Sequence, residues 1–67
     1  MFDFIMGKSY ITVKYKGTFY LEETYEQLKK KMNDDSSTIT VRVTDFTGIG
    51  YDTRTFNKED ITSYGRN

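Results

Sequence analysis

The stretch that decides the fold is TYEQLKKKMNDDSSTITVRVT, residues 24–44, which predicts a capped helix followed directly by a strand. Thr24 and Gln27 match the S/T-x-x-E/Q capping box, in which each partner satisfies a free amide at the start of a helix. The predicted helix therefore runs from residue 25 to about residue 32. The polar cluster at 33–37 ends it, because short polar side chains favour turns.

The predicted helix is amphipathic. Tyr25, Leu28 and Met32 fall on one face at intervals of three and four residues, which is the spacing of a face that packs on a core. Glu26 is placed to pair with Lys30 one turn later. We expect Tyr25 inside the protein, together with Tyr15 of the hairpin that precedes the helix, and Tyr10 and Tyr51 at least partly exposed.

The strand that follows has the clearest alternation in the chain. Ile39, Val41 and Val43 face one way, and the polar residues between them face the other. One face of this strand is therefore expected to pack on the core and the other to face solvent. Phe46 breaks this alternation, which indicates a bulge or a twist before the loop at 47–50.

A hairpin is predicted ahead of the helix. Residues 10–15 alternate as a strand, with Tyr15 on the apolar face, and residues 18–21 return as a second strand. Lys16 and Gly17 between them favour a tight turn.

The register of this hairpin has two solutions. A two-residue loop at 16–17 sets Phe19 opposite Lys14 and Tyr20 opposite Val13. Either Tyr20 belongs to the core or a bulge intervenes, and the sequence leaves both open.

Two further strands complete the predicted fold. Residues 51–56 alternate as the partner of the strand at 38–44, a turn follows at 57–60, and residues 61–64 form a short last strand. The prediction is an α+β fold with the order ββαβββ, built as a small antiparallel sheet or a partly open β-barrel with one helix.

Chain length and composition predict one domain over residues 1–67. The chain has no cysteine and no histidine, so its stability depends on packing rather than on disulfides or zinc. We expect residues 1–8 to be a flexible or alternative start segment, with Met6 as the second start, and residues 65–67 to fray. The missing cysteines fit a reducing cytoplasm, and no signal peptide or membrane span is recognisable.

The residues that most enzymes use are absent. Without histidine and cysteine the chain lacks the commonest general base, the thiol nucleophile and the usual zinc ligands. Asp45 and Asp52 flank a glycine loop and are explained equally well as turn residues, while the glycines at 48 and 50 lack the following helix of a phosphate site. We expect no catalytic residues, no metal site and no cofactor.

Two surfaces are candidates for binding. One combines acidic residues around the helix with exposed tyrosines and an apolar loop tip, and would suit an arginine-rich groove. Its predicted members are Glu22, Glu23, Glu26, Asp34, Asp35, Tyr10, Tyr51 and Ile49. The alternative is a basic and aromatic surface for single-stranded nucleic acid. Its predicted lysines are Lys14, Lys16, Lys29, Lys30 and Lys31.

Three stretches give the chain a resemblance to known proteins: YITVKYKGTFYLEETYEQLKKKM at 10–32, TITVRVTDFTG at 38–48 and FNKEDITSY at 56–64. Together they resemble small phage and prophage proteins of low-GC Gram-positive bacteria, some of which are anti-CRISPR proteins. The resemblance implies a non-enzymatic inhibitor that covers a surface of a Cas9-type nuclease or its guide complex. It transfers no functional residue, and the formal net charge of zero departs from the acidic inhibitors that mimic DNA.

The leading hypothesis is therefore a phage-type inhibitor of a host nucleic-acid enzyme such as a Cas9-type nuclease. The alternative is a small nucleic-acid-binding β-rich module. The third is a structural or assembly protein that pairs through an edge strand, which allows a homodimer.

Overall fold

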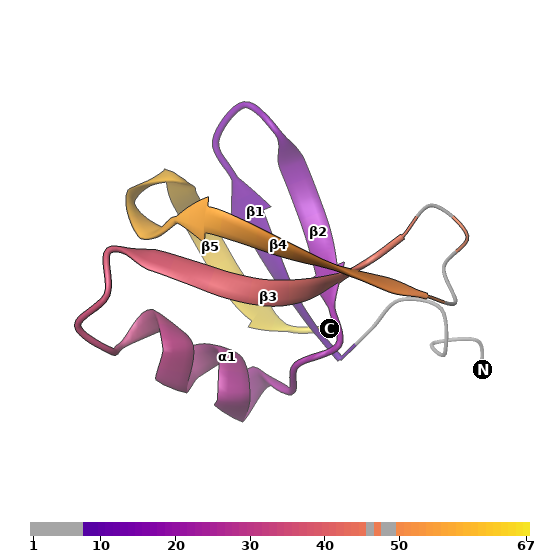
Figure 1. Ribbon diagram of the computed structural model, residues 1–67, viewed down its shortest axis with the longest axis horizontal. Helices are drawn as coiled ribbons and strands as arrows, with labels where there is room; N and C mark the ends of the chain where they lie inside the picture. Colours follow the sequence, from indigo (N-terminus) through magenta and orange to yellow (C-terminus); the bar gives the residue numbers. More distant parts are fainter. Residues whose placement is uncertain (1–7, 46, 48–49) are drawn as a thin grey trace.

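The computed structural model describes residues 8–45, 47 and 50–67 (Figure 1). Expectations for residues 1–7, Phe46, Gly48 and Ile49 lie outside the described residues. The elements in chain order are β1 Ser9–Val13, β2 Gly17–Leu21, α1 Tyr25–Met32, β3 Thr38–Thr44, β4 Tyr51–Asn57, the 3₁₀ turn η2 Lys58–Asp60 and β5 Ile61–Arg66.

The five strands form one antiparallel sheet in the order β4-β3-β2-β1-β5. This confirms the predicted α+β class and the order ββαβββ. The turn η2 connects the two edge strands, because Asn57 pairs with Thr38 of β3 while Ile61 pairs with Val13 of β1. The sheet is therefore strongly coiled but open between β4 and β5.

The core lies on one face of this sheet. Its buried hydrophobic residues are Ile11, Val13, Leu21, Leu28, Ile39, Val41, Val43 and Phe56. The helix α1 packs on that face through Leu28, its one buried residue, so the opposite face of the sheet has no helix over it among the described residues. The alternation of β3 predicted this division of faces correctly.

The local signals around α1 are also confirmed. Gln27 N–H donates to Thr24 Oγ1 at 3.2 Å, and Thr24 N–H donates to Gln27 Oε1 at 3.0 Å, which completes the capping box. The charge pairing was predicted wrongly, because Glu26 pairs with Arg66 of β5 at 3.1 Å rather than with Lys30. A strand beside the helix offers a guanidinium that helical spacing cannot reveal.

The β1–β2 hairpin has a longer loop than predicted. Val13 pairs with Gly17, so residues 14–16 form a three-residue loop that Lys16 N–H closes on Val13 O at 3.0 Å. Tyr15 has a left-handed φ of 67° and is 95% exposed, which contradicts its predicted place on the core face. The longer loop puts Phe19 opposite Ile11 and so turns Tyr20 to the outer face.

The chain end is ordered further than we expected. β5 continues to Arg66, where Gly65 pairs with Tyr10, and Asn67 N–H donates to Lys8 O at 3.2 Å. Residues 65–67, for which we expect fraying, thus take part in backbone pairing in the structure. Lys8, at the end of the predicted flexible start, also donates its N–H to Leu21 O at 2.8 Å.

Candidate binding surface

Tyrosines gather on the outer face of the sheet, over which no described helix lies. Tyr10 and Tyr20 are direct cross-strand partners on β1 and β2, and both point away from the core because their neighbours Ile11 and Leu21 are buried. Each is half-buried, so each shows part of its ring to solvent. This confirms the predicted partial exposure of Tyr10.

The same line of residues continues across β3 and β4. Leu21 pairs with Val43, which sets Tyr20 beside Thr44, and Thr44 pairs with Tyr51. Tyr10, Tyr20 and Tyr51 thus form a cross-sheet line that we call the tyrosine row. Tyr51 is also half-buried, as predicted for a residue available to a partner.

A glycine makes room at the end of the row. A Cβ built on Gly65 would lie only 3.0 Å from Tyr10 Cε2 and 3.0 Å from its Oη. Tyr10 therefore lies against the bare backbone of β5, a close approach that only glycine permits without displacing the ring.

The row carries little net charge. The guanidinium of Arg42 lies 5.9 Å from the centre of the Tyr51 ring, and its Nε is 3.1 Å from Glu22 Oε1. This cation over the Tyr51 ring is thus matched by an anion. The described part of the outer face is accordingly aromatic and rich in threonine rather than basic or acidic.

The predicted acidic surface is largely neutralised. Four of its five carboxylates form ion pairs, namely Glu22 with Arg42, Glu23 with Lys31, Glu26 with Arg66 and Asp34 with Lys58. Asp35 is exposed. These acids are therefore weaker candidates for an arginine-rich partner than their number suggests.

Two of these ion pairs also affect the pKa of their acid. The pKa of Glu26 is lowered by a backbone hydrogen bond and by Arg66. The pKa of Asp34 is lowered mainly by its hydrogen bond from Lys58, and further by the N–H of Ser36. Because their pKa values are lowered, both carboxylates are charged at neutral pH. Glu26 holds Arg66 of β5, and Asp34 holds Lys58 of η2.

The predicted lysine surface is split into two parts. Lys14 and Lys16 flank Tyr15 at the hairpin loop, which we call the tip, whereas residues 29–31 lie on α1 (Figure 1). The tip and α1 lie at opposite ends of the molecule in that view. Lys31 is moreover engaged with Glu23 and Thr40 O. The lysines therefore do not form one nucleic-acid surface.

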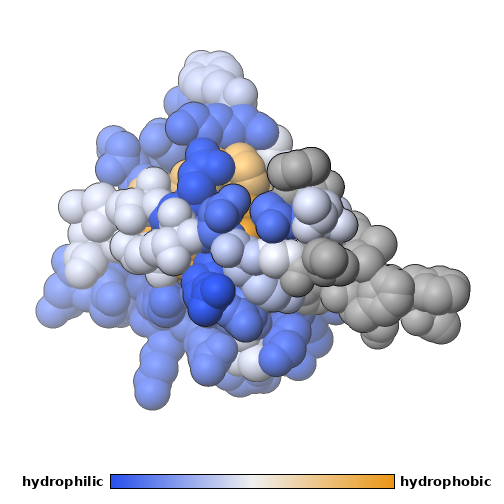
Figure 2. Space-filling model, turned by 45° about the vertical axis from the view of Figure 1, so that its right-hand side comes forward, coloured by the Kyte–Doolittle hydropathy of each residue, from blue (hydrophilic) through white to orange (hydrophobic). Residues whose placement is uncertain are grey.

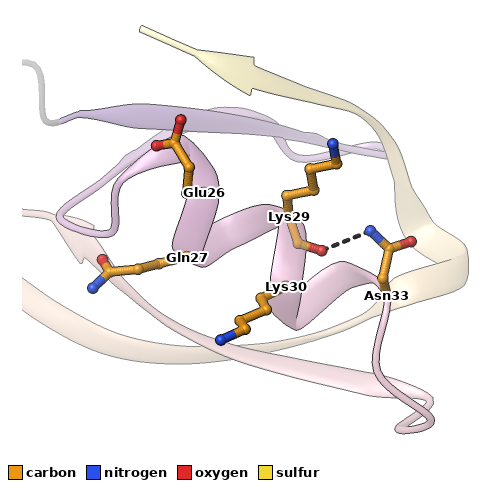
Figure 3. Close-up of a pocket in the computed structure, with 5 residues that line it drawn as sticks. All are labelled: Glu26, Gln27, Lys29, Lys30 and Asn33. Carbon is orange, nitrogen blue, oxygen red and sulfur yellow. Dashed lines mark hydrogen bonds between the residues drawn. The ribbon is translucent and has the colours of Figure 1, made fainter.

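A hollow with a volume of about 560 Å³ lies on the outside of α1. Figure 3 shows its side chains spreading from a single helix, with Asn33 Nδ2 donating to Lys29 O at 2.8 Å. Its lining residues are Glu26, Gln27, Lys29, Lys30 and Asn33. No described residue of a second element lines it, so within the described residues it is a shallow surface of one helix.

The described residues contain no group of three or more acidic, histidine or cysteine side chains that would hold a metal ion. None of the helices in the described ranges has the length and apolarity needed to cross a membrane. Comparison of the chain with protein-family models, with curated proteins and with solved structures gives no match.

The sequence left the face of Tyr20 open, and it did not identify Thr44 and Arg42 as members of this surface. Their assignment depends on the hairpin register and on the single β2–β3 pairing at Leu21 and Val43. The signal that would have found Tyr20 is the burial of Leu21, because a buried residue sends its strand neighbour to the other face.

Proposed function

We propose that this chain is a non-enzymatic binding protein that docks on another protein through the tyrosine row. The observation that carries the proposal is the alignment of Tyr10, Tyr20 and Tyr51 across the sheet face that no described helix covers. Tyrosine gives a large contact area at a small loss of side-chain entropy, and its hydroxyl group accepts or donates a hydrogen bond at the edge of a contact.

The charge balance of the row supports a protein partner rather than nucleic acid. Nucleic-acid surfaces need an excess of cations to neutralise phosphates. Arg42, the cation over the Tyr51 ring, is paired with Glu22 and so contributes no net positive charge at this end of the row.

The partner we propose is a nucleic-acid enzyme of a bacterial host, such as a Cas9-type nuclease. This choice rests on the resemblance to phage and prophage proteins. The mechanism we propose is occlusion of a surface of that enzyme by the tyrosine row, since the neutralised acids offer little for mimicry of DNA.

Replacing single tyrosines of the row tests this function. Tyr20→Ala and Tyr51→Ala are each expected to weaken binding about 30-fold, because truncation of a central aromatic anchor costs about 2 kcal/mol. The matched control is Thr55→Ala, on the same outer face and exposed, with an expected change below about twofold. The measurement is capture from a Gram-positive host lysate followed by titration of the purified enzyme. Recovery of no nucleic-acid enzyme, or equal binding by all three variants, would contradict the proposal.

The tip favours a second candidate function, which is binding of single-stranded nucleic acid. Tyr15 stands between two lysines with its ring 95% exposed and the Lys14 Nζ 5.5 Å from its centre. A left-handed conformation costs a residue other than glycine about 1 kcal/mol, and such strain is concentrated at functional positions. A base stacked on this ring would have a cation on either side for the backbone.

A Tyr15→Gly variant tests the second candidate. The fold should tolerate it, because glycine adopts the left-handed φ of residue 15 freely. Wild-type protein is expected to bind a short single-stranded oligonucleotide at ~50 mM salt and at least tenfold more weakly at ~200 mM salt, and the variant to lose binding at both. Fluorescence anisotropy measures this, and an absence of wild-type binding at low salt removes the candidate.

A further inference from the structure

The strand β4 is one edge of the sheet, and its hydrogen-bond pattern can be fixed. Within the described residues it pairs only with β3. Asp45 N–H donates to Gly50 O at 2.9 Å, and at the other end Lys58 N–H donates to Ser37 O at 2.9 Å. Bonded and non-bonded pairs alternate along an antiparallel ladder. The even-numbered residues of β4 therefore use their backbone groups toward β3.

The odd-numbered residues of β4 then point their backbone groups away from the sheet. Tyr51, Thr53 and Thr55 each present an N–H and a C=O along the open edge. An edge of this kind is a template for another strand unless charge, proline or a bulge prevents pairing. The described strand contains no proline and no register shift.

Two opposite charges lie two residues apart on this edge strand. Asp52 and Arg54 lie on the same face of β4, and both are exposed. The guanidinium of Arg54 lies 5.7 Å from the Phe19 ring centre and 5.6 Å from that of Phe56, which holds it beside the core. Figure 2 shows the small apolar area below the tip with hydrophilic side chains around it. Arg54 is thus held in place rather than free in solvent.

We propose that β4 pairs antiparallel with β4 of a second copy, with Thr53 opposite the partner's Thr53. This twofold arrangement brings the outward backbone groups of Thr53 together as a hydrogen-bonded pair, and those of Tyr51 with the partner's Thr55. Asp52 then stands directly opposite the partner's Arg54, and the same contact forms a second time by symmetry. These are non-hydrogen-bonded pairs, in which facing side chains come closest.

The charges select this register over its neighbours. The free backbone groups allow shifts of two residues only. A shift in one direction sets Arg54 opposite the partner's Arg54, and a shift in the other sets Asp52 opposite the partner's Asp52. Like charges directly opposite each other are destabilising. A second copy therefore fits this edge because hydrogen bonding and charge agree in one self-complementary register.

The dimer is independent of the proposed tyrosine-row function but compatible with it. Tyr51 would face the partner's Thr55 on the outer face, so two tyrosine rows would lie on one continuous sheet. The competing explanation is that charges on an edge strand keep the protein monomeric. The two explanations make opposite predictions for a charge exchange.

Sedimentation of four proteins separates them: wild type, Asp52→Lys, Arg54→Glu and the double exchange. The wild type is expected to reach a dimer mass with rising concentration, and each single variant to weaken the dimer at least tenfold, because it sets like charges opposite each other twice. The double exchange is expected to restore the dimer, because it reverses both charges and keeps every contact opposite in sign. A monomeric wild type at all concentrations overturns the proposal, and so does a double exchange no better than the single variants.

A register-specific cross-link adds a readout that does not depend on charge. Because the chain has no cysteine, Thr53→Cys introduces a single thiol at the proposed twofold axis. Its Cα would be about 5.5 Å from that of the partner's residue 53, within reach of a disulfide. The control Thr55→Cys would be separated from its copy by more than about 10 Å. Efficient oxidation by diamide is expected for the first variant alone, and equal cross-linking of both would overturn the register.

Discussion

Leu28→Ala is expected to lower the free energy of unfolding by about 3 kcal/mol, which is the usual loss for a buried leucine. Leu28 is fully buried, and it is the one buried residue of α1. A helix of eight residues has no stability of its own in water, so packing decides whether it forms. A domain of 67 residues has only about 3 to 10 kcal/mol to lose.

The measurement is urea unfolding followed by circular dichroism. A matched control is Lys30→Ala on the same helix, because Lys30 is exposed and belongs neither to the capping box nor to the core cluster. Its expected change is below about 0.5 kcal/mol, because alanine is an even better helix former than lysine. Equal effects of the two substitutions would show that α1 is not held by its contact with the core.

The parts of the fold that were predicted correctly depend on local rules. The capping box of Thr24 and Gln27 and the alternation of β3 each involve neighbours within a few residues. These signals predicted the helix, one core face and the order of the elements around them. Local chemistry was sufficient there because nothing distant competed with it.

The hairpin was mispredicted because Gly17 had two compatible positions. We placed it inside a two-residue turn, but it follows a three-residue loop with a φ of 94°. The left-handed position within the loop is occupied by Tyr15 instead, against its intrinsic preference. No residue rule assigns such a conformation to tyrosine, so the exposure of the tip was missed and the direction of Tyr20 was left open.

The ion pairs of the candidate acidic residues could not be predicted for a different reason, which is their range along the sequence. Arg66 reaches Glu26 across 40 residues, and Lys58 reaches Asp34 across 24. A cluster of acids in sequence therefore need not be an acidic surface in space. Only the strand register, which brings β5 and η2 beside α1, determines which carboxylates remain available to a partner.

Glu23→Ala is expected to lower the free energy of unfolding by about 2 kcal/mol, although sequence analysis assigned this residue to partner binding. Its carboxylate accepts the Arg42 N–H at 3.1 and 3.2 Å and the Lys31 Nζ at 3.2 Å, and its side chain is only 11% exposed. Its carbonyl oxygen also accepts the buried Ser9 hydroxyl at 2.7 Å. Glu23 thus connects β1, α1 and β3.

The neighbouring Glu22 is the natural control for Glu23. Glu22 pairs with the Arg42 side chain, but the two side chains are 43% and 54% exposed, so Glu22→Ala should cost less than about 1 kcal/mol. Glu23→Gln should fall between them, because an amide oxygen still accepts the Arg42 N–H while the charge opposite Lys31 is lost. Urea unfolding of the three variants measures this order. Equal losses in the free energy of unfolding for Glu22→Ala and Glu23→Ala would show that the carboxylate of Glu23 does not hold β3 to the helix. Glu23 would then again be a candidate for partner binding.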